Sequence, residues 1–317
     1  ESEVQAMGLE IERTPGRDGF GDILKARTPW GGDGPGILVL SHLDTVHAIG
    51  TKEGKNPIRR EDDKVYGPGI YDMKAGGYIA YYALRHLVRQ GKKPKLPVTF
   101  LFIPEEEVGS PTSRARIEAA AKDHKYALVM EPGRDGDKVV TSRKGVGRFV
   151  MTVKGRASHA GVRHEDGRSA IVEMARQILR IEGKTDYARG ITCNVGLIDG
   201  GTGVNVVPAE CRVEIDLRVP SQQLAEEMTH WFFGLEAIGS DVEVTVEGGM
   251  NRPPYQKDAG IADLFGKAQT IYREIGKELA DVPLTGGGSD GNFTAALGIP
   301  TLDGLGADGK GAHAAYE

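Results

Sequence analysis

Histidine and carboxylate residues follow the short apolar runs of this sequence at four places. These residues are His42 with Asp44, Glu105 to Glu107, Glu131, and His313. If the apolar runs are strands of an α/β sheet, their carboxyl ends share one edge, which is where such sheets bind ligands. Imidazole nitrogen and carboxylate oxygen are both good zinc ligands. The pattern therefore predicts a cluster of metal-competent side chains at one edge of a sheet.

Each of these residues also has an ordinary interpretation when it is taken alone. A His-x-Asp pair such as His42 and Asp44 is common in surface loops, and Asp72, just before a predicted helix, is a normal N-cap. Glu105 to Glu107 would be unremarkable as a solvated acidic turn. Glu131 is harder to explain, because a buried carboxylate is costly unless a metal or hydrogen bonds compensate it. The convergence of these residues at strand ends is what favours a metal site.

The number of candidate ligands indicates more than one metal ion. Two histidines and at least three carboxylates exceed the three protein ligands that a single catalytic zinc needs. They fit two ions, about 3.5–4 Å apart, that share a bridging carboxylate. Along an extended segment His42 and Asp44 point to the same side, so Asp44 can hold the ring of His42 for a metal. A further acid beside the ligands would serve as general base.

The elements that must position these residues alternate between strand and helix. The expected strands are 37–40, 98–103, 126–130 and 299–302. The expected helices are 74–90, 112–122, 261–275 and 290–297. This alternation predicts an α/β domain with a parallel or mixed sheet and helices on both faces. In the helix 74–90, the apolar stripe expected to face the core is Ile79, Tyr82, Leu84, Leu87 and Val88.

A different pattern interrupts this domain. Residues 145–250 read as β-α-β-β-α-β, the order of a ferredoxin-like α+β unit, and about 100 residues is a normal size for a small domain. We therefore expect a discontinuous catalytic domain, residues 1–144 and 251–317, with an inserted domain at 145–250.

Composition excludes several classes of protein. The chain has 317 residues, of which 39% are apolar and 27% charged, as in ordinary globular proteins. A net charge of −5 argues against a broad nucleic-acid surface. No apolar run approaches the ~20 residues of a membrane span. The two cysteines, Cys193 and Cys211, are too few for a disulfide framework or a thiolate zinc site.

Both ends of the sequence indicate a longer natural protein. Glu1 reads as a start inside a domain, and residues 313–317 follow a glycine-rich loop without a closing helix. We expect a cytoplasmic location, with the periplasm as the alternative because the N-terminus reads as truncated.

The motifs around the candidate residues resemble the zinc aminoacylase and glutamate carboxypeptidase family of co-catalytic metallopeptidases. The matching stretches are 41–46, 66–76, 104–110, 130–132, 155–161, 205–208, 216–218, 286–292 and 311–313. They occur in the family's order and cover nearly the whole chain. The resemblance implies two zinc ions per chain, with cobalt or manganese as substitutes. His42 and Glu131 would bind one ion, Glu107 and His313 the other, and Asp72 would bridge them.

The resemblance also implies residues that assist the metal ligands. Asp44 would orient His42, and Glu106 would be the general base. The peptide bond between Asp72 and Met73 would be cis. The inserted domain would be a lid and dimerisation domain, through which the chain forms a homodimer and His159 reaches the partner's active site to stabilise the oxyanion.

Further residues would contact the substrate by the same resemblance. Asn205 and Arg218 look like contacts to a substrate carboxylate, although an ion pair of Arg218 with Asp216 or Glu214 is an open alternative. Gly287 would lie against the substrate backbone, where a side chain would clash. Arg252, at the return from the inserted domain, is a further candidate for holding a free carboxylate.

The function that follows is a di-zinc amidohydrolase. It would cleave an N-acyl amino acid or a peptide and release an amino acid with a free carboxylate, as a carboxypeptidase G-like enzyme or an N-acyl-amino-acid hydrolase. Acetylornithine deacetylase or succinyl-diaminopimelate desuccinylase chemistry would use the same residues. A non-enzymatic alternative is a catalytically silent dimer that binds amino acids or peptides, which metal analysis would distinguish. The inserted domain argues against a third alternative, a single-metal aminopeptidase.

Overall fold

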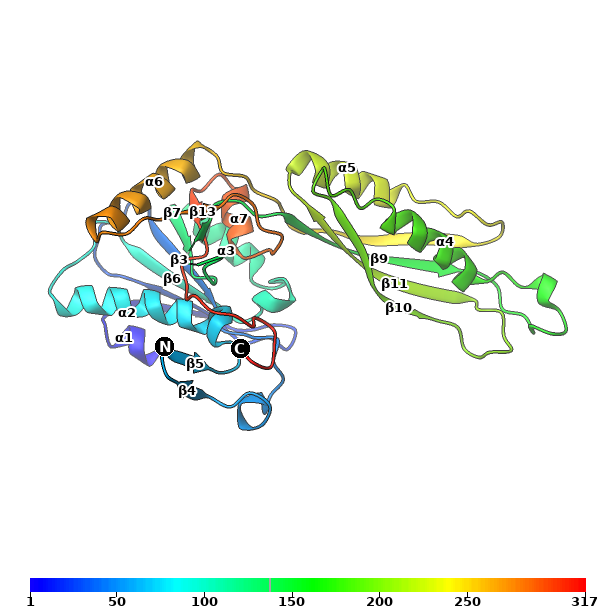
Figure 1. The fold of residues 1–317 in the computed structure, drawn as a ribbon, viewed down its shortest axis with the longest axis horizontal. Helices are drawn as coiled ribbons and strands as arrows, with labels where there is room; N and C mark the ends of the chain where they lie inside the picture. The colour runs from blue at the N-terminus through cyan, green and yellow to red at the C-terminus, as the bar shows by residue number, and fades with distance from the viewer. Residues whose placement is uncertain (137) are drawn as a thin grey trace. The chain divides into compact units, whose positions relative to one another are not determined.

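The structure is a computed structural model that describes residues 1–136 and 138–317, and these form two compact units (Figure 1). The first unit comprises Glu1–Ser142, Gln256–Thr285 and Ser289–Glu317. The second comprises Arg143–Tyr255 and Gly286–Gly288. None of the helices in the described ranges is long and apolar enough to cross a membrane.

The first unit is built on a mixed six-stranded sheet in the order β1-β2-β6-β3-β7-β14. Its strands are β1 (Glu10–Thr14), β2 (Ile23–Arg27), β3 (Gly36–His42), β6 (Val98–Ile103), β7 (His124–Val129) and β14 (Thr301–Leu302). Strand β3 is parallel to both β6 and β7, and β14 is parallel to β7, whereas β2 is antiparallel to β6. The carboxyl ends of β6, β3, β7 and β14 therefore share one edge, as predicted.

Helices cover both faces of this sheet. The helices are α2 (Ala75–Arg89), α3 (Arg114–Lys122), α6 (Ala259–Glu274) and α7 (Gly291–Ala296). Val39 packs in the cluster of α2, and its register partner Leu128 packs against α6, so these two helices cover the same face. Leu38 and Leu40, which alternate with Val39, pack with residues of α3 and α7 on the other face. The expected α/β class, with helices on both faces, is confirmed.

The buried stripe predicted for helix α2 is partly wrong. Leu84 is buried, but Ile79, Tyr82 and Leu87 are exposed, and the helix buries Tyr81 instead. The backbone at the start of the helix lies close to the sheet, because a Cβ added at Gly76 would lie 1.9 Å from the Met130 backbone carbonyl and one at Gly77 would lie 2.3 Å from the Ser41 hydroxyl. The glycines at the start of the helix thus decide which face turns toward the sheet.

Short elements complete the first unit. They are α1 (Ser2–Gln5), the hairpin of β4 (Arg59–Glu61) and β5 (Lys64–Tyr66), and the parallel pair β8 (Val139–Val140) and β13 (Asp281–Val282). Single turns occur at η1 (Thr51–Glu53), η2 (Ile70–Lys74) and η3 (Glu106–Val108). The last two carry predicted site residues.

The second unit has the predicted ferredoxin-like order. Its elements are β9 (Gly145–Lys154), η4 (His164–Asp166), α4 (Ala170–Glu182), β10 (Thr192–Gly200), β11 (Glu210–Val219), α5 (Gln222–Phe233) and β12 (Glu243–Arg252). The sheet order is β10-β11-β9-β12, and every neighbouring pair is antiparallel. Both helices pack on this sheet through one apolar cluster, in which the rings of Phe149 and Phe232 stack 4.3 Å apart. The role of this unit as a lid and dimerisation domain stays a prediction.

The two cysteines belong to this apolar core. Cys193 and Cys211 are both buried and free. Burial raises the pKa of the Cys193 thiol to about 11, so the thiolate is scarcely populated at neutral pH. Both residues are thus small side chains of the core.

Candidate active site

The predicted metal ligands of the first unit come from the shared strand edge. His42 is the last residue of β3, and Glu131 lies two residues beyond the end of β7. Glu107 lies in the turn η3 after β6. Asp72 lies in η2, immediately before helix α2, where its backbone is not helical. His313 follows β14 and has a positive φ of 65°.

Asp72 lies at the centre of these side chains. Its Oδ1 is 3.3 Å from Nε2 of His42, and its Oδ2 is 3.5 Å from Nε2 of His313. Nε2 of His42 is also 3.8 Å from Glu131 Oε1, and Nε2 of His313 is 3.1 Å from Glu107 Oε2. The structure therefore brings all five predicted ligands together, and Asp72 presents one oxygen to each histidine. The Asp72-Met73 peptide bond is cis, as the resemblance implied.

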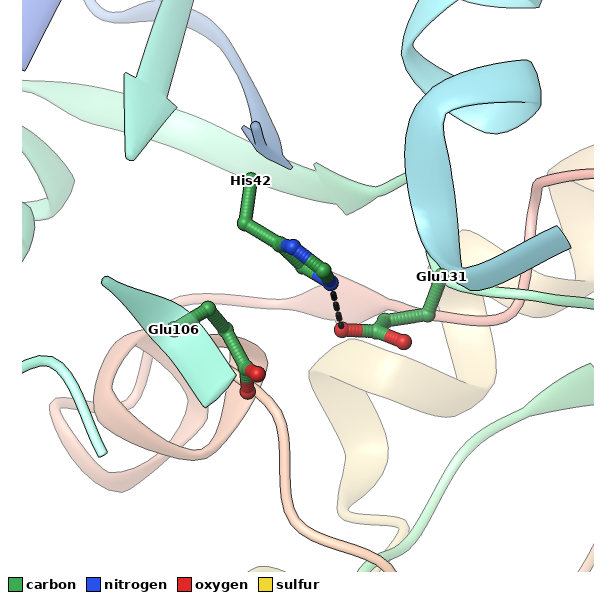
Figure 2. Close-up of side chains that lie close together, drawn as sticks. All are labelled: His42, Glu106 and Glu131. Carbon is green, nitrogen blue, oxygen red and sulfur yellow. Dashed lines mark ion pairs between the residues drawn. The ribbon is translucent and has the colours of Figure 1, made fainter. Parts of the chain in front are cut away.

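Glu106 points into the same cluster. Figure 2 shows the ends of its side chain, of His42 and of Glu131 directed toward one another. One ligand atom from each of these residues lies within 4.8 Å of the others. Glu106 is thus within the site and beside the candidate ligands, where a general base has to be.

Asp44 connects two parts of the site. Its Oδ1 lies 3.4 Å from Nδ1 of His42, and its backbone oxygen lies 3.1 Å from the same nitrogen. The carboxylate also accepts the backbone N–H groups of Glu106 (3.1 Å) and Glu107 (2.9 Å). With Nδ1–H donated to Asp44, Nε2 is directed at Asp72 and Glu131, the orientation in which the neutral ring would bind a metal.

The close approach of so many carboxylates shifts their pKa values in opposite directions. Burial alone would lower the pKa of His42, but hydrogen bonds to Asp44 and Asp72 and the nearby glutamates raise it well above its ordinary value. Burial and the charge of Asp72 raise the pKa of Glu107 to about 7. Burial is the strongest influence on the pKa of Asp72 and raises it, but the hydrogen bond with His42 and the charges of His42, His313 and Arg134 together outweigh burial, and the net shift is downward. Negative charge is in excess, and a cation would relieve it.

A test of whether these residues fit a metal comes from Glu107. Its Oε1 is buried and has no hydrogen-bond partner in the described part of the chain. Leaving a buried carboxylate oxygen unpaired costs free energy, so this atom lacks the cation or donor that would compensate it. The donors around it are imidazole nitrogen and carboxylate oxygen, the set that zinc accepts. The residues fit a metal site.

The predicted oxyanion donor His159 and the predicted substrate residue Asn205 lie on neighbouring loops of the second unit. His159 is exposed and pairs with Val206 as an isolated bridge, and its Nδ1 accepts the N–H of Gly161 at 3.1 Å. Asn205 is also exposed, and its backbone oxygen accepts the N–H of Ala160 at 3.0 Å. Their roles in catalysis and substrate binding stay predictions.

The other three predicted substrate residues have partners within the second unit. Arg218 makes a bidentate ion pair with Asp216, at 2.7 and 2.9 Å, so the ion-pair alternative considered from the sequence is present. The carbonyl of Gly287 accepts from Arg143 at 3.1 Å. Arg252 is buried, and a Cβ added at Gly288 would lie 2.6 Å from its Cδ. Their contacts to substrate stay predictions.

Sequence reasoning missed three residues that belong to the surroundings of the site. Arg134 lowers the pKa of Asp72 through its charge, although burial and His42 act on that pKa more strongly. Glu317 and His47 form an ion pair at 2.7 Å beside the segment that carries Asp72. Neither the type nor the spacing of Arg134 indicates that it lies near the site. For Glu317, the only indication in the sequence is that it lies four residues after His313.

Comparison with known proteins agrees with this geometry. The model of peptidase family M20/M25/M40 matches residues 38–317. Carboxypeptidase G2 of Pseudomonas sp. (strain RS-16) is 33% identical over 99% of this chain and 76% of its own length. A succinyl-diaminopimelate desuccinylase of Hydrogenovibrio crunogenus is 25% identical over 95% of this chain and 82% of its own length.

Solved structures show the same fold. A tripeptidase from Staphylococcus aureus has a TM-score of 0.74 and 23% identity, and the match covers 100% of this chain and 85% of that one. An M20 family metallo-carboxypeptidase from Sulfolobus solfataricus has a TM-score of 0.72 and 18% identity, with 100% and 87% covered. The chain therefore belongs to peptidase family M20/M25/M40, a family of metal-dependent peptidases, and is an enzyme that hydrolyses amide bonds.

Proposed function

We propose that this enzyme is a di-zinc amidohydrolase that releases an amino acid with a free carboxylate, in the manner of a carboxypeptidase G. The observation that carries the proposal is the position of Asp72, which presents one carboxylate oxygen to His42 and the other to His313. A carboxylate placed in this way is suited to bridging two cations. Similarity to carboxypeptidase G2 supports the choice of substrate class.

The five ligands divide into two sets around Asp72. His42 and Glu131 would hold one ion, and Glu107 and His313 the other, since the two histidines face opposite oxygens of Asp72 and each lies beside one of these glutamates. The chemistry that such a metal pair supplies when bound is a water of lowered pKa and polarisation of the substrate carbonyl.

Glu106 would perform the proton transfers. Its carboxylate accepts a proton from the water that attacks the amide carbon, and the new C–O bond forms as the carbonyl π bond opens. Glu106 then gives this proton to the amide nitrogen while the C–N bond breaks, which releases the amine of the amino acid. The role of Asp44 is to hold the turn of Glu106 and Glu107 through their backbone N–H groups.

The second unit would complete the site in a homodimer. His159 would reach the active site of the other subunit and donate to the carbonyl oxygen as it becomes negative. Its exposure supports this role, because an exposed side chain is available to a second chain. Asn205, Arg218, Gly287 and Arg252 would contact the released amino acid and its carboxylate.

A complementation experiment tests the dimer and His159 together. The variants Glu106→Gln and His159→Ala are each expected to be nearly inactive. In a mixed dimer the Glu106→Gln subunit supplies its intact His159 to the other subunit, which still has Glu106. Activity should therefore return on mixing the two variants. Absence of recovery in a mixture shown to contain mixed dimers would contradict action between subunits.

The main experiment is metal analysis followed by an activity panel. We expect about two zinc ions per chain after loading and dialysis. The loaded enzyme should hydrolyse N-acyl amino acids and peptides with a C-terminal glutamate. Protein that folds but binds no metal, or that binds metal and hydrolyses none of these amides, would contradict the proposal.

A second candidate is a deacylase of the desuccinylase type. The 25% identity with a succinyl-diaminopimelate desuccinylase extends over 95% of this chain, and that chemistry would use the same metal ligands and base. Including N-succinyl-diaminopimelate and N-acetylornithine in the panel separates the two candidates, because kcat/KM ranks the substrates directly.

A further inference from the structure

A buried carboxylate outside the predicted ligand set lies beside the central aspartate. Glu317 is 3% exposed. Its Oε1 accepts the backbone N–H of Tyr71 (3.0 Å) and of Asp72 (2.8 Å). Its Oε2 accepts the backbone N–H of Gly69 (2.8 Å) and lies 2.7 Å from Nε2 of His47.

These contacts distinguish Glu317 from a metal ligand. Both of its oxygens face N–H donors, three from one stretch of backbone and one from an imidazole ring. An anion seated in a concave run of backbone N–H groups is a well-known way to fix a loop. Here the loop is the segment 69–72, whose remaining N–H, that of Ile70, bonds to Gly67 at 3.1 Å.

The main chain of Glu317 holds the same loop from a second direction. Its backbone oxygen accepts the N–H of Gly67 at 2.9 Å and the side-chain amide of Asn56 at 3.2 Å. Asn56 is fully buried, so this contact is protected from water. Glu317 thus binds the loop before helix α2 at two places, with its carboxylate at residues 69–72 and with its backbone oxygen at Gly67.

The turn that carries Glu317 also carries a predicted ligand. Within 311–317, the N–H of Glu317 bonds to Ala314 at 3.2 Å, and that of Ala314 to Gly311 at 2.8 Å. A Cβ added at Gly311 would lie 2.9 Å from the ring of Tyr316, so the turn is tightly folded. One compact turn therefore approaches Asp72 twice, with His313 at the carboxylate and Glu317 at the backbone N–H.

The geometry points to Glu317 as a positioning residue for the metal centre, which acts through the backbone of residues 69–72 to fix the carboxylate of Asp72 between its two histidines. This inference rests on the proposed metal-bridging role of Asp72. Loss of the Glu317 carboxylate would leave three backbone donors without acceptors and would release Asp72 to move relative to His42. Partners that orient metal ligands in this way typically change metal affinity by about 10–100-fold when they are lost.

The test is the affinity of the full-length variant Glu317→Gln for zinc, measured by chelator competition. Glutamine keeps the size of the side chain but puts an NH₂ donor against groups that are themselves donors. We expect affinity to fall about 10–100-fold. The absorption spectrum of the cobalt-loaded protein should change as well, because the coordination of Asp72 changes. Wild-type affinity together with a wild-type cobalt spectrum would overturn the inference.

Glu173 in the second unit provides the matched control. It is also a buried carboxylate that accepts two backbone N–H groups, from Ile238 (2.8 Å) and Gly239 (2.9 Å). The variant Glu173→Gln should lose stability but keep wild-type zinc affinity. If it loses the same affinity as Glu317→Gln, the effect is one of general stability, and the inference is overturned.

A variant with a shorter side chain at position 317 keeps the test decisive if Glu317→Gln does not fold. Glu317→Asp retains the charge but cannot reach all three N–H groups, so its zinc affinity should lie below that of the wild type. A folded Glu317→Asp protein with wild-type affinity would then overturn the inference. Failure of the wild-type protein itself to bind zinc would instead count against the proposed function.

Discussion

The two halves of the active site differ in how far they are exposed. The side chain of His42 is 1% exposed and that of its neighbour Glu131 is 6% exposed. In contrast, the side chain of His313 is 54% exposed. His42 ends a strand in the middle of the sheet and is oriented by Asp44, whereas His313 lies on a loop. The difference teaches that the core of the fold sets the position of His42, whereas a surface loop sets that of His313.

The largest effect is expected from the base in the buried half. Glu106→Gln should lower kcat by about 10²–10⁴-fold, because proton transfer contributes about that factor. Metal content should stay at the wild-type value, since the other carboxylates remain. Steady-state kinetics and metal analysis on the same sample check both statements. The variant Glu118→Gln, which changes a half-buried carboxylate paired with Arg114 on α3, is the control and should be fully active.

Near-wild-type turnover in Glu106→Gln would remove Glu106 from the proton transfer. In that case the buried half would contribute only ligands.

Removing one histidine from each half tests the comparison directly. His42→Ala should lose bound metal and lower the free energy of unfolding by about 1–3 kcal/mol, because buried carboxylates lose their partner. His313→Ala should retain one metal ion more firmly than the other. In the absence of metal, it should unfold at a temperature close to that of the metal-free wild type. Metal stoichiometry after dialysis and thermal unfolding measure the two effects. Equal losses in both variants would contradict the difference between the halves.

Asp44→Asn probes how the buried half is held in place. The amide cannot satisfy His42 and both N–H groups of the Glu106 and Glu107 turn, so we expect metal affinity to fall about 10–100-fold. Chelator competition measures this loss. Asp22→Asn, which changes an exposed ion pair with Arg13, should leave affinity unchanged. A tightly binding Asp44→Asn protein would show that strand geometry alone orients His42.

The smallest effect concerns His124, a buried histidine whose ring nitrogens lie against a carbonyl and a hydroxyl. His124 contacts the Ala120 carbonyl at 2.6 Å and the Thr99 hydroxyl at 2.8 Å, and burial lowers its pKa. Because the unfolded chain then binds the proton more readily, this stabilisation is present above pH ~6.5 and is lost as pH falls below that value. Urea unfolding from pH 7.5 to pH 5 should show the loss in the wild type, and a smaller one in His124→Gln. Identical pH dependence in both proteins would contradict it.

The meeting of His42, Glu107 and Glu131 at one edge could be predicted because it follows from strand order. His42, Glu107 and Glu131 each come just after a buried apolar run, and parallel strands carry such residues to one edge. Asp72 and His313 lie in loops, so the sequence pattern provided weaker signals for them: Asp72 precedes a predicted helix, and His313 comes about ten residues after an apolar run. The ferredoxin-like order of the second unit was also readable, because its strands and helices alternate clearly.

What the sequence could not show depends on backbone contacts. Glu317 acts on main-chain N–H groups, which nearly every residue has, so no pattern of side chains predicts its role. The buried face of α2 was misjudged because apolar periodicity ignores how closely two backbones can approach. The antiparallel strand β2 is short, and its sequence alternates too weakly to be recognised.

The contact between the start of α2 and the sheet limits how this enzyme can be redesigned. A Cβ at Gly76 would lie 1.9 Å from the Met130 carbonyl, and one at Gly77 would meet Ser41, next to His42. Any larger residue there would push the helix outward and carry Asp72 away from the histidines. Substitutions introduced to alter substrate preference should therefore leave Gly76 and Gly77 unchanged, whatever their distance from the substrate.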